Sequence, residues 1–197
     1  MINQGDETSP TPDPDCVELD NKIKNEEGQL PNAVKNVPHT TAAMRTKENG
    51  ITKKTEWTCS NYSGMSAAQK KRAVAGQPTA SAYPRTVTQC GQLHEHRKYR
   101  PKADSGCDCE ARLLFDMKPA SNTELIFKIR WQDQSGVHPG PCDKCFDLMC
   151  ITWKYCGIKI SVCNENNTKQ EDIKDDCNNS NRKQGHKDFT KKLTTKT

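Results

Sequence analysis

The cysteines constrain the fold of this chain more than any other feature. Ten of its 11 cysteines lie between Cys59 and Cys177, in a sequence of 197 residues that is 32% hydrophobic and 6% aromatic. Globular chains are usually about 45–50% apolar, so a chain of this composition cannot bury a large core. The sequence therefore predicts a small domain whose stability depends on what its cysteines bind.

Alternating apolar residues predict a β-hairpin in the middle of the chain. Every second residue is apolar over 111–117 and again over 125–131, with a loop between the two runs. An isolated hairpin is only marginally stable in water, so further strands are needed. We expect one strand at 56–59 and two more in the apolar runs 146–153 and 158–162.

Thiol and imidazole side chains flank this hairpin. Cys107 and Cys109 precede its first strand, and His138 follows its second strand. Structural zinc ions are held by four such ligands in a tetrahedron. The layout predicts a structural zinc site, and the alternative is that the two cysteines are small buried residues at the start of a strand.

The same segments resemble a known group of zinc-binding modules. Trp57-Thr-Cys59, then Cys107-Asp-Cys-Glu-Ala-Arg-Leu113, the hairpin, and Gly136-Val-His-Pro139 are similar to the FLYWCH, WRKY and mutator-like-transposase-associated zinc fingers, over residues 55–142. The resemblance implies a small antiparallel sheet clamped by one zinc ion. It also implies DNA binding, which many members of the group show.

By position, the resemblance implies Cys59, Cys109 and His138 as zinc ligands. Gly136 stands where the group has the first of two closing residues, so the fourth ligand must come from elsewhere, and Cys142 is the nearest candidate. Four thiolate or imidazole ligands leave no open position for water, which makes the ion structural rather than catalytic. The alternative ligands are Cys107, Cys90, His94 and His96.

The spacing of Cys142 and Cys145 suggests a second zinc site. Two residues between cysteines form the tight turn that zinc ligands commonly use. The other ligands would come from Cys150, Cys156 and Cys163, none of which repeats that spacing. The alternative is that these thiols are buried or unligated in an extension of the domain.

The middle of the chain is basic enough to favour a polyanionic partner. Residues 57–131 carry 12 basic and 6 acidic side chains, a net charge of +6. Neutralising DNA phosphates with release of their counterions provides most non-specific affinity for nucleic acid. We expect Arg112, Lys128 and Arg130 to project toward phosphates from the solvent-facing side of the hairpin, with an ordinary solvated face as the alternative. A second basic cluster consists of Lys70, Lys71 and Arg72.

Composition divides the chain into four parts. Residues 1–52 are predicted to form a disordered arm and residues 164–197 a disordered basic tail, because neither has enough apolar residues to offset chain entropy. Between them, residues 53–142 would form a zinc-finger-like β domain and residues 143–163 a cysteine-rich β extension. The predicted fold class is a small β-rich, zinc-stabilised domain, an antiparallel sheet with a central hairpin, flanked by disordered arms.

These features predict a zinc-dependent DNA-binding module, either a regulator or a remnant of a mobile-element protein. No apolar run reaches the roughly 18 residues of a membrane span, and the start lacks the features of a secretory signal, so we expect a nuclear or intracellular protein. No nucleophile motif or phosphate-binding loop is present, so we expect no enzymatic activity. The alternatives are a secreted disulfide-rich protein and a zinc-scaffolded protein-interaction module without nucleic acid.

Overall fold

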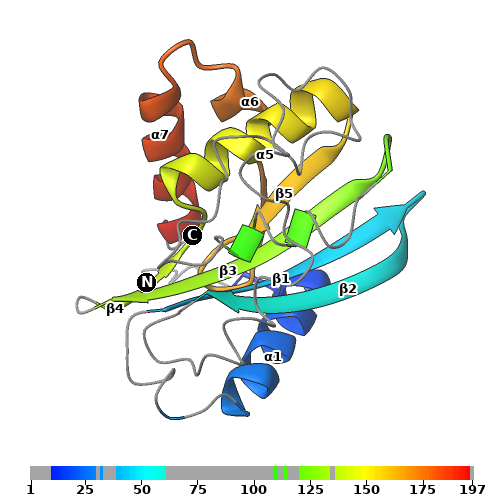
Figure 1. The fold of residues 1–197 in the computed structure, drawn as a ribbon, viewed down its shortest axis with the longest axis vertical. Helices are drawn as coiled ribbons and strands as arrows, with labels where there is room; N and C mark the ends of the chain where they lie inside the picture. Colours follow the sequence, from blue (N-terminus) through cyan, green and yellow to red (C-terminus); the bar gives the residue numbers. More distant parts are fainter. Residues whose placement is uncertain are drawn as a thin grey trace, which may run out of the picture.

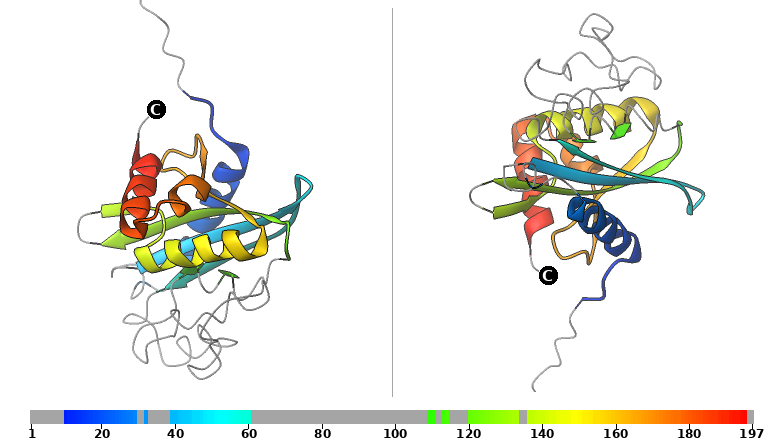
Figure 2. Two further views of the ribbon diagram at one scale, coloured as in Figure 1. Left: turned by 90° about the horizontal axis from the view of Figure 1, so that it is seen from above. Right: turned by 60° about the horizontal axis from the view of Figure 1, so that its bottom comes forward.

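The structure of the protein, a computed structural model, is a mixed β-sheet with helices on both faces (Figure 1, Figure 2). It describes residues 10–29, 32, 39–60, 109–110, 113–114, 120–133 and 136–195. The strands are β1 (His39–Glu48), β2 (Ile51–Ser60), β3 (Glu124–Asp133), β4 (Gly136–Pro139), β5 (Lys159–Cys163) and β6 (Gln170–Asp172). The helices are α1 (Pro14–Gly28), α5 (Asp143–Cys156), α6 (Lys174–Cys177) and α7 (Arg182–Thr194).

The sheet combines antiparallel and parallel neighbours. In the described part its strands follow the order β2-β1-β3-β5-β6, and β4 also pairs with β3. Strand β5 lies beside the first half of β3 and β4 beside its second half, on the edge opposite β1. Strands β3 and β5 run parallel and are connected through α5, whereas the other pairs are antiparallel. The small β-rich domain that the sequence predicts is confirmed, but its sheet is mixed.

Strands β1 and β2 form a long hairpin with a two-residue turn. Asn49 and Gly50 have φ angles of 51° and 77°, the left-handed conformation that a tight turn between antiparallel strands requires. The register accordingly pairs Glu48 with Ile51 across the turn. The predicted strand at 56–59 is confirmed as part of β2. Its partner β1 lies in the region that the sequence analysis assigned to a disordered arm.

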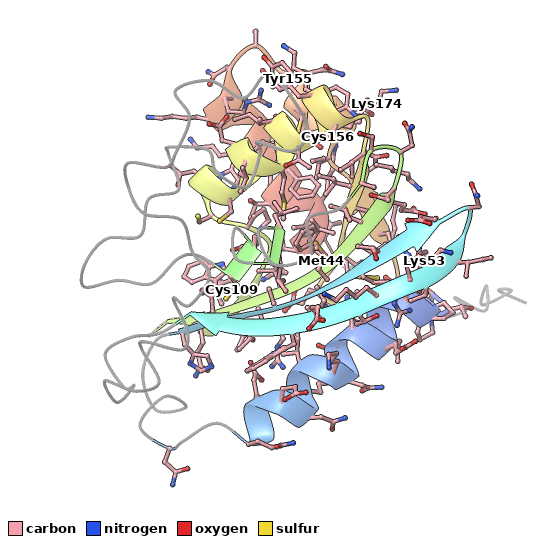
Figure 3. All side chains as sticks on the ribbon, turned by 45° about the vertical axis from the view of Figure 1, so that its right-hand side comes forward. Met44, Lys53, Cys109, Tyr155, Cys156 and Lys174 are labelled. Atoms are coloured by element: carbon pink, nitrogen blue, oxygen red, sulfur yellow. A yellow bond between two sulfur atoms is a disulfide. The ribbon has the colours of Figure 1, made fainter. Side chains whose placement is uncertain are left out.

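Side chains of β3 alternate between two buried faces of the sheet. Leu125, Phe127 and Ile129 are fully buried in the large cluster that includes α5 and α7. Ile126 packs in a second cluster with α1. Met44 of β1 lies between the sheet and the helices of the first face (Figure 3). The strand predicted at 125–131 is confirmed, and both of its faces are covered.

Helix α1 covers one face of the sheet. Asp13 caps its start by accepting a hydrogen bond from the Cys16 N–H at 3.0 Å, and a proline occupies the first turn. Leu19 and Ile23 are fully buried against the sheet. A disulfide joins Cys16 to Cys163 of β5. These contacts order a segment whose composition alone predicts disorder.

Complementary charges also join α1 to the sheet. Asp15 near its start accepts hydrogen bonds from Arg45 and Lys47 of β1. Glu27 near its end forms an ion pair with Arg130 of β3 at 3.2 Å. The acidic helix therefore lies along basic side chains of β1 and β3, and its charge favours this face of the sheet.

Helices α5, α6 and α7 cover the opposite face (Figure 2). Helix α5 ends at Cys156, and Gly157 follows as its C-cap with a φ of 62°. The rings of Phe146 in α5 and Phe189 in α7 lie 5.4 Å apart between centroids. A disulfide between Cys150 and Cys177 joins α5 to α6. Cross-links therefore hold helices on both faces of the molecule.

Three further predicted regions differ from the structure. Residues 146–153, predicted as a strand, lie in α5. Leu113 and Leu114, from the predicted strand 111–117, are helical and buried in the core cluster. The region 164–197, predicted as a disordered tail, contains β6, α6 and α7 in its described part, because α7 places apolar side chains in the core. The strand predicted at 158–162 is confirmed as β5.

Candidate binding site

A pocket of about 290 Å³ opens where the strand ends meet α5 and α7. The strands contribute Thr40, Trp131 and His138 to its walls, and α7 contributes one more side. The segment 139–142, which connects β4 to α5, forms the wall between them. The pocket is mostly apolar, and Glu110 adds a carboxylate.

The backbone of the segment 139–142 is restricted by its residue types. Prolines at 139 and 141 fix φ at these positions. Gly140 between them has a φ of 97°, which residues with a Cβ rarely adopt. A Cβ on Gly140 would lie 2.6 Å from Cδ1 of Leu193, so α7 packs directly on this glycine. The segment is therefore a rigid wall of the pocket.

Trp131 and His138 form an aromatic pair at the pocket. They are directly opposite each other in the β3–β4 register, so their side chains lie side by side. Their ring centroids are 4.3 Å apart with an interplanar angle of 30°. Trp131 is 37% exposed, which is unusual for such a large apolar side chain. The pair offers a flat surface on which another ring can stack.

His186 closes the pocket from α7. Its Nε2 lies 2.9 Å from the carbonyl oxygen of Pro141, and because that oxygen only accepts, we assign the ring hydrogen to Nε2. The imidazole centroid is also 5.4 Å from that of Phe146. No local motif points to His186 as a site residue, because only the packing of α7 brings it to the pocket.

Cys142 lies at the rim of the pocket, at the start of α5. As the N-cap residue, it accepts a hydrogen bond on its sulfur from the Cys145 N–H at 3.5 Å. Its carbonyl accepts another from the Phe146 N–H at 2.8 Å. Cys142 is exposed, whereas Cys145 is fully buried. Cys142 and Cys145 thus lie at the start of a helix of 14 residues, where backbone N–H groups favour negative charge.

Three of the four predicted zinc ligands lie around this pocket. His138 and Cys142 line it. Cys109 is buried nearby (Figure 3) and donates a hydrogen bond from its sulfur to the Thr40 carbonyl at 2.9 Å. Cys59 lies in β2, and its side chain is outside the described residues. Residues predicted as ligands of one zinc ion thus lie at the same end of the sheet.

The described donor atoms do not fit a zinc ion. Within the part of the chain that the structure describes, no three His, Cys, Asp or Glu side chains form a group that could hold a metal. A structural zinc site needs four such ligands about 2.0–2.3 Å from the ion. Stabilisation by zinc therefore stays a prediction.

Three of the cysteines predicted for a second zinc site are in disulfides. Cys150 is bonded to Cys177, and Cys163 to Cys16. Cys156 is disulfide-bonded as well. Zinc binds the thiolate, which a disulfide sulfur cannot provide. The structure therefore assigns these cysteines to cross-links.

Lys128 does not project into solvent as the sequence analysis expected. It is 2% exposed, and its Nζ donates hydrogen bonds to the carbonyl oxygens of Asn164 at 2.7 Å and Glu165 at 3.2 Å. Burial lowers the pKa of Lys128 to about 8, against the opposing effect of the Asp20 carboxylate and with a contribution from Arg130. Helix α1 covers this face of β3, so Lys128 is not available to phosphates.

Comparisons with known proteins do not assign the site. No family model, curated protein or solved structure matches the chain. The resemblance to the zinc-finger group therefore stays a prediction from motifs. None of the helices that the structure describes combines the length and apolar character needed to cross a bilayer. The predicted site residues outside the described part are Cys90, Cys107, His94, His96, Arg112, Lys70, Lys71 and Arg72.

Proposed function

We propose that the protein is a binding protein of an oxidising compartment, whose pocket receives one aromatic or aliphatic group of a partner. The observation that carries this proposal is an apolar pocket with a rigid wall and an exposed ring surface at Trp131. Concave apolar sites with a few polar groups are where proteins most often bind ligands.

The disulfides support an oxidising compartment. The partners Cys16 and Cys163 are 147 residues apart in the sequence, and Cys150 and Cys177 are 27 apart. Disulfides persist in secreted and other oxidising environments, whereas reducing compartments keep thiols reduced. Cross-links also suit a small domain with a limited apolar core. These observations favour the secreted disulfide-rich alternative over an intracellular protein.

The size of the pocket limits what can bind. Its volume of about 290 Å³ is near the lower end of the roughly 300–1,000 Å³ typical of ligand sites. That space suits one ring or branched aliphatic group, and it is too small for an extended cofactor. Trp131 and His138 provide the stacking surface for such a group. We therefore favour a side chain of a bound polypeptide as the occupant.

Titration with aromatic probes tests this proposal. We expect indole and N-acetyl-phenylalanine amide to shift the backbone amide resonances of Gly140 and Cys142 in a nuclear magnetic resonance titration. Removing the stacking surface with Trp131→Ala should weaken binding up to about tenfold, because an aromatic pair contributes roughly 0.5–1.5 kcal/mol beyond its buried area.

A matched control distinguishes binding in the pocket from nonspecific binding of aromatic probes to the protein surface. Tyr155, 47% exposed, lies at the far end of α5 and does not line the pocket (Figure 3). Tyr155→Ala should bind the probes as the unmodified protein does. Shifts spread over the whole surface, or equal losses in Trp131→Ala and Tyr155→Ala, would contradict the proposed site.

A zinc-dependent DNA-binding module is the second candidate function. The observation that favours it is that His138 and Cys142, two of the predicted ligands, line the same pocket. Native mass spectrometry before and after chelation, with DNA retention at low salt, tests this candidate. Bound zinc whose removal unfolds the protein would support it. A metal-free protein that keeps its fold would favour the first candidate.

A further inference from the structure

We propose that Cys142 and Cys145 form a redox-active pair that exchanges a disulfide with a cysteine-containing polypeptide. The choice of a docked polypeptide rests on the proposed function of the pocket. The chemistry of the pair rests on separate observations, which are its spacing, its position at a helix start and the different burial of its two sulfurs.

The pair has the sequence spacing of a reversible disulfide. Cys142 is the N-cap of α5 and Cys145 lies three residues later in the first turn. Side chains three residues apart on a helix have Cβ atoms about 5–6 Å apart, and a disulfide needs about 3.5–4.5 Å. A small adjustment of the first turn therefore closes the bond. The 3.5 Å contact between the Cys145 N–H and the Cys142 sulfur shows that the turn already folds back on Cys142.

The start of α5 presents backbone N–H groups to the Cys142 sulfur. The sulfur accepts a backbone N–H, and the remaining N–H groups of the first turn point in the same direction. A helix of 14 residues also presents the positive end of its dipole there. Cysteines at helix starts in a Cys-x-x-Cys arrangement are those whose thiolates most readily attack disulfides.

The connection of α5 to the sheet supports the same reading. Strands β3 and β5 are parallel neighbours, and α5 belongs to the crossover between them. In sheets of this kind, ligands bind beyond the ends of the strands, where such helices begin. A Cys-x-x-Cys motif near a β-α-β crossover is typical of dithiol redox sites.

Burial separates this pair from the structural disulfides. Cys16 and Cys163 are fully buried, and Cys150 and Cys177 are at most 5% exposed. Of the cysteines whose side chains the structure describes, Cys142 is the exposed one. Disulfide exchange needs direct access of one sulfur to another. A partner in the pocket meets Cys142 first, because Cys142 lines that pocket.

The exchange proceeds in two balanced steps. The Cys142 thiolate attacks one sulfur of the partner's disulfide, a mixed disulfide forms, and the partner's other sulfur leaves as a thiolate that takes up a proton. The Cys145 thiolate then attacks the Cys142 sulfur, the mixed disulfide breaks, and the second partner sulfur leaves and is protonated. Two electrons and two protons pass from the pair to the partner. The reverse sequence oxidises a partner dithiol, and relative reduction potentials set the direction.

Equilibration in glutathione redox buffers tests the chemistry without any docking. The full, oxidatively folded chain is incubated at graded ratios of reduced to oxidised glutathione, alkylated and digested. We expect the peptide with Cys142 and Cys145 to gain and lose two hydrogens reversibly while Cys16–Cys163 and Cys150–Cys177 stay bonded. Cys145→Ser should accumulate a mixed disulfide with glutathione at Cys142, about tenfold more than the unmodified protein, because the resolving thiolate is missing. Cys142→Ser should form none.

Two results would contradict the proposal that Cys142 and Cys145 form a redox-active pair. One is an unmodified Cys142 at every glutathione ratio. The other is a constitutive disulfide from Cys142 or Cys145 to some other cysteine. The docking step is tested apart from the chemistry, with a disulfide-bonded peptide that carries a phenylalanine beside its cysteine. Trp131→Ala should slow exchange with this peptide by a larger factor than exchange with glutathione. The same fractional change for both substrates would remove the pocket from the proposal and keep the redox pair.

Discussion

Lys128 is a buried cation whose charge costs stability at neutral pH. Its ammonium group is enclosed between β3 and α1 and donates to the carbonyl oxygens of Asn164 and Glu165. Burial lowers its pKa to about 8, below the 10.5 of an exposed lysine, although the Asp20 carboxylate acts in the opposite direction. The unfolded chain therefore binds this proton more tightly than the folded protein does.

We predict that Lys128 makes the protein more stable as the pH rises from about 8 to 10.5. Below this window both states carry the proton, and the cost of burying the charge is fully present. Above it neither state does, and the cost is gone. The gain is on the order of 3 kcal/mol over the window.

Urea unfolding of the protein and of Lys128→Met at a series of pH values isolates this contribution from other titrating groups. The difference in unfolding free energy between the two should change across the window. A difference that stays constant would mean that Lys128 keeps its ordinary pKa in the fold.

At the scale of elements, α1 is positioned by charge as well as by apolar contacts. Burial raises the pKa of Asp15, but hydrogen bonds from Lys47 and Arg45 outweigh this effect and bring the pKa below its usual value. Arg45 is only 4% exposed, so water replaces a lost partner poorly. The attachment of α1 to β1 therefore depends on an ionised Asp15.

Asp15→Asn should lower the unfolding free energy by about 1–3 kcal/mol at neutral pH, because a buried guanidinium loses a charged partner. The effect should fade as the pH falls below 3.8 and through the lowered pKa, where the unmodified carboxyl is protonated too. Glu56→Gln, in the exposed ion pair with Lys54, is the control and should change stability by less than about 0.5 kcal/mol. A loss for Asp15→Asn that persists at low pH would point to packing instead of charge.

Helix α7 depends on a close approach at Gly185. A Cβ there would lie 2.3 Å from the carbonyl oxygen of Asp176 in α6, a distance that real atoms do not tolerate. Gly185→Ala should therefore destabilise the protein by roughly 1–3 kcal/mol, although alanine is the better helix former.

Gly28→Ala at the end of α1, where a Cβ meets open space, is the matched control. It should be neutral or slightly stabilising in thermal unfolding. Equal thermal shifts for Gly185→Ala and Gly28→Ala would mean that α7 does not pack on α6 in this way.

The strands were easier to predict from the sequence than the helices. The sequence predicts β3 and β5, because a buried strand can be recognised from a short apolar run or from apolar residues at every second position. The run 146–153 has the same appearance, yet it is helical because it lies between the N-cap Cys142 and the αL residue Gly157. Two other short sequence motifs also indicate local structure. Asp13-Pro14 is typical of the start of a helix, and Asn49-Gly50 is typical of a hairpin turn.

Other features have no local signal. The sequence predicts that Lys128 and its apolar neighbours point to opposite faces of β3. Whether the face with Lys128 meets solvent depends on α1, which is far away in the chain. The pocket likewise combines Trp131, Cys142 and His186 from three separate elements, and its volume follows from how they pack. The cysteines could be counted, but their pairing could not be deduced, because connectivity is not encoded in spacing.

At the scale of the whole molecule, disulfides cross-link elements on both faces of the sheet. Cys16–Cys163 joins α1 to β5 on one face, and Cys150–Cys177 joins α5 to α6 on the other. Native disulfides in small domains typically contribute about 2–5 kcal/mol each, a large share of the stability of such a fold. We therefore expect the fold to depend on oxidised cysteines at these positions rather than on bound zinc.

Peptide mapping of the native, unreduced protein by mass spectrometry tests this claim most directly. Thiols are first blocked with an alkylating reagent, and the digest is searched for linked peptides. We predict peptides that link Cys16 to Cys163 and Cys150 to Cys177, from a protein that keeps its fold in the presence of chelator. Alkylation of all four of these cysteines in the folded, zinc-containing protein would contradict stabilisation by disulfides and would favour the zinc-dependent module instead.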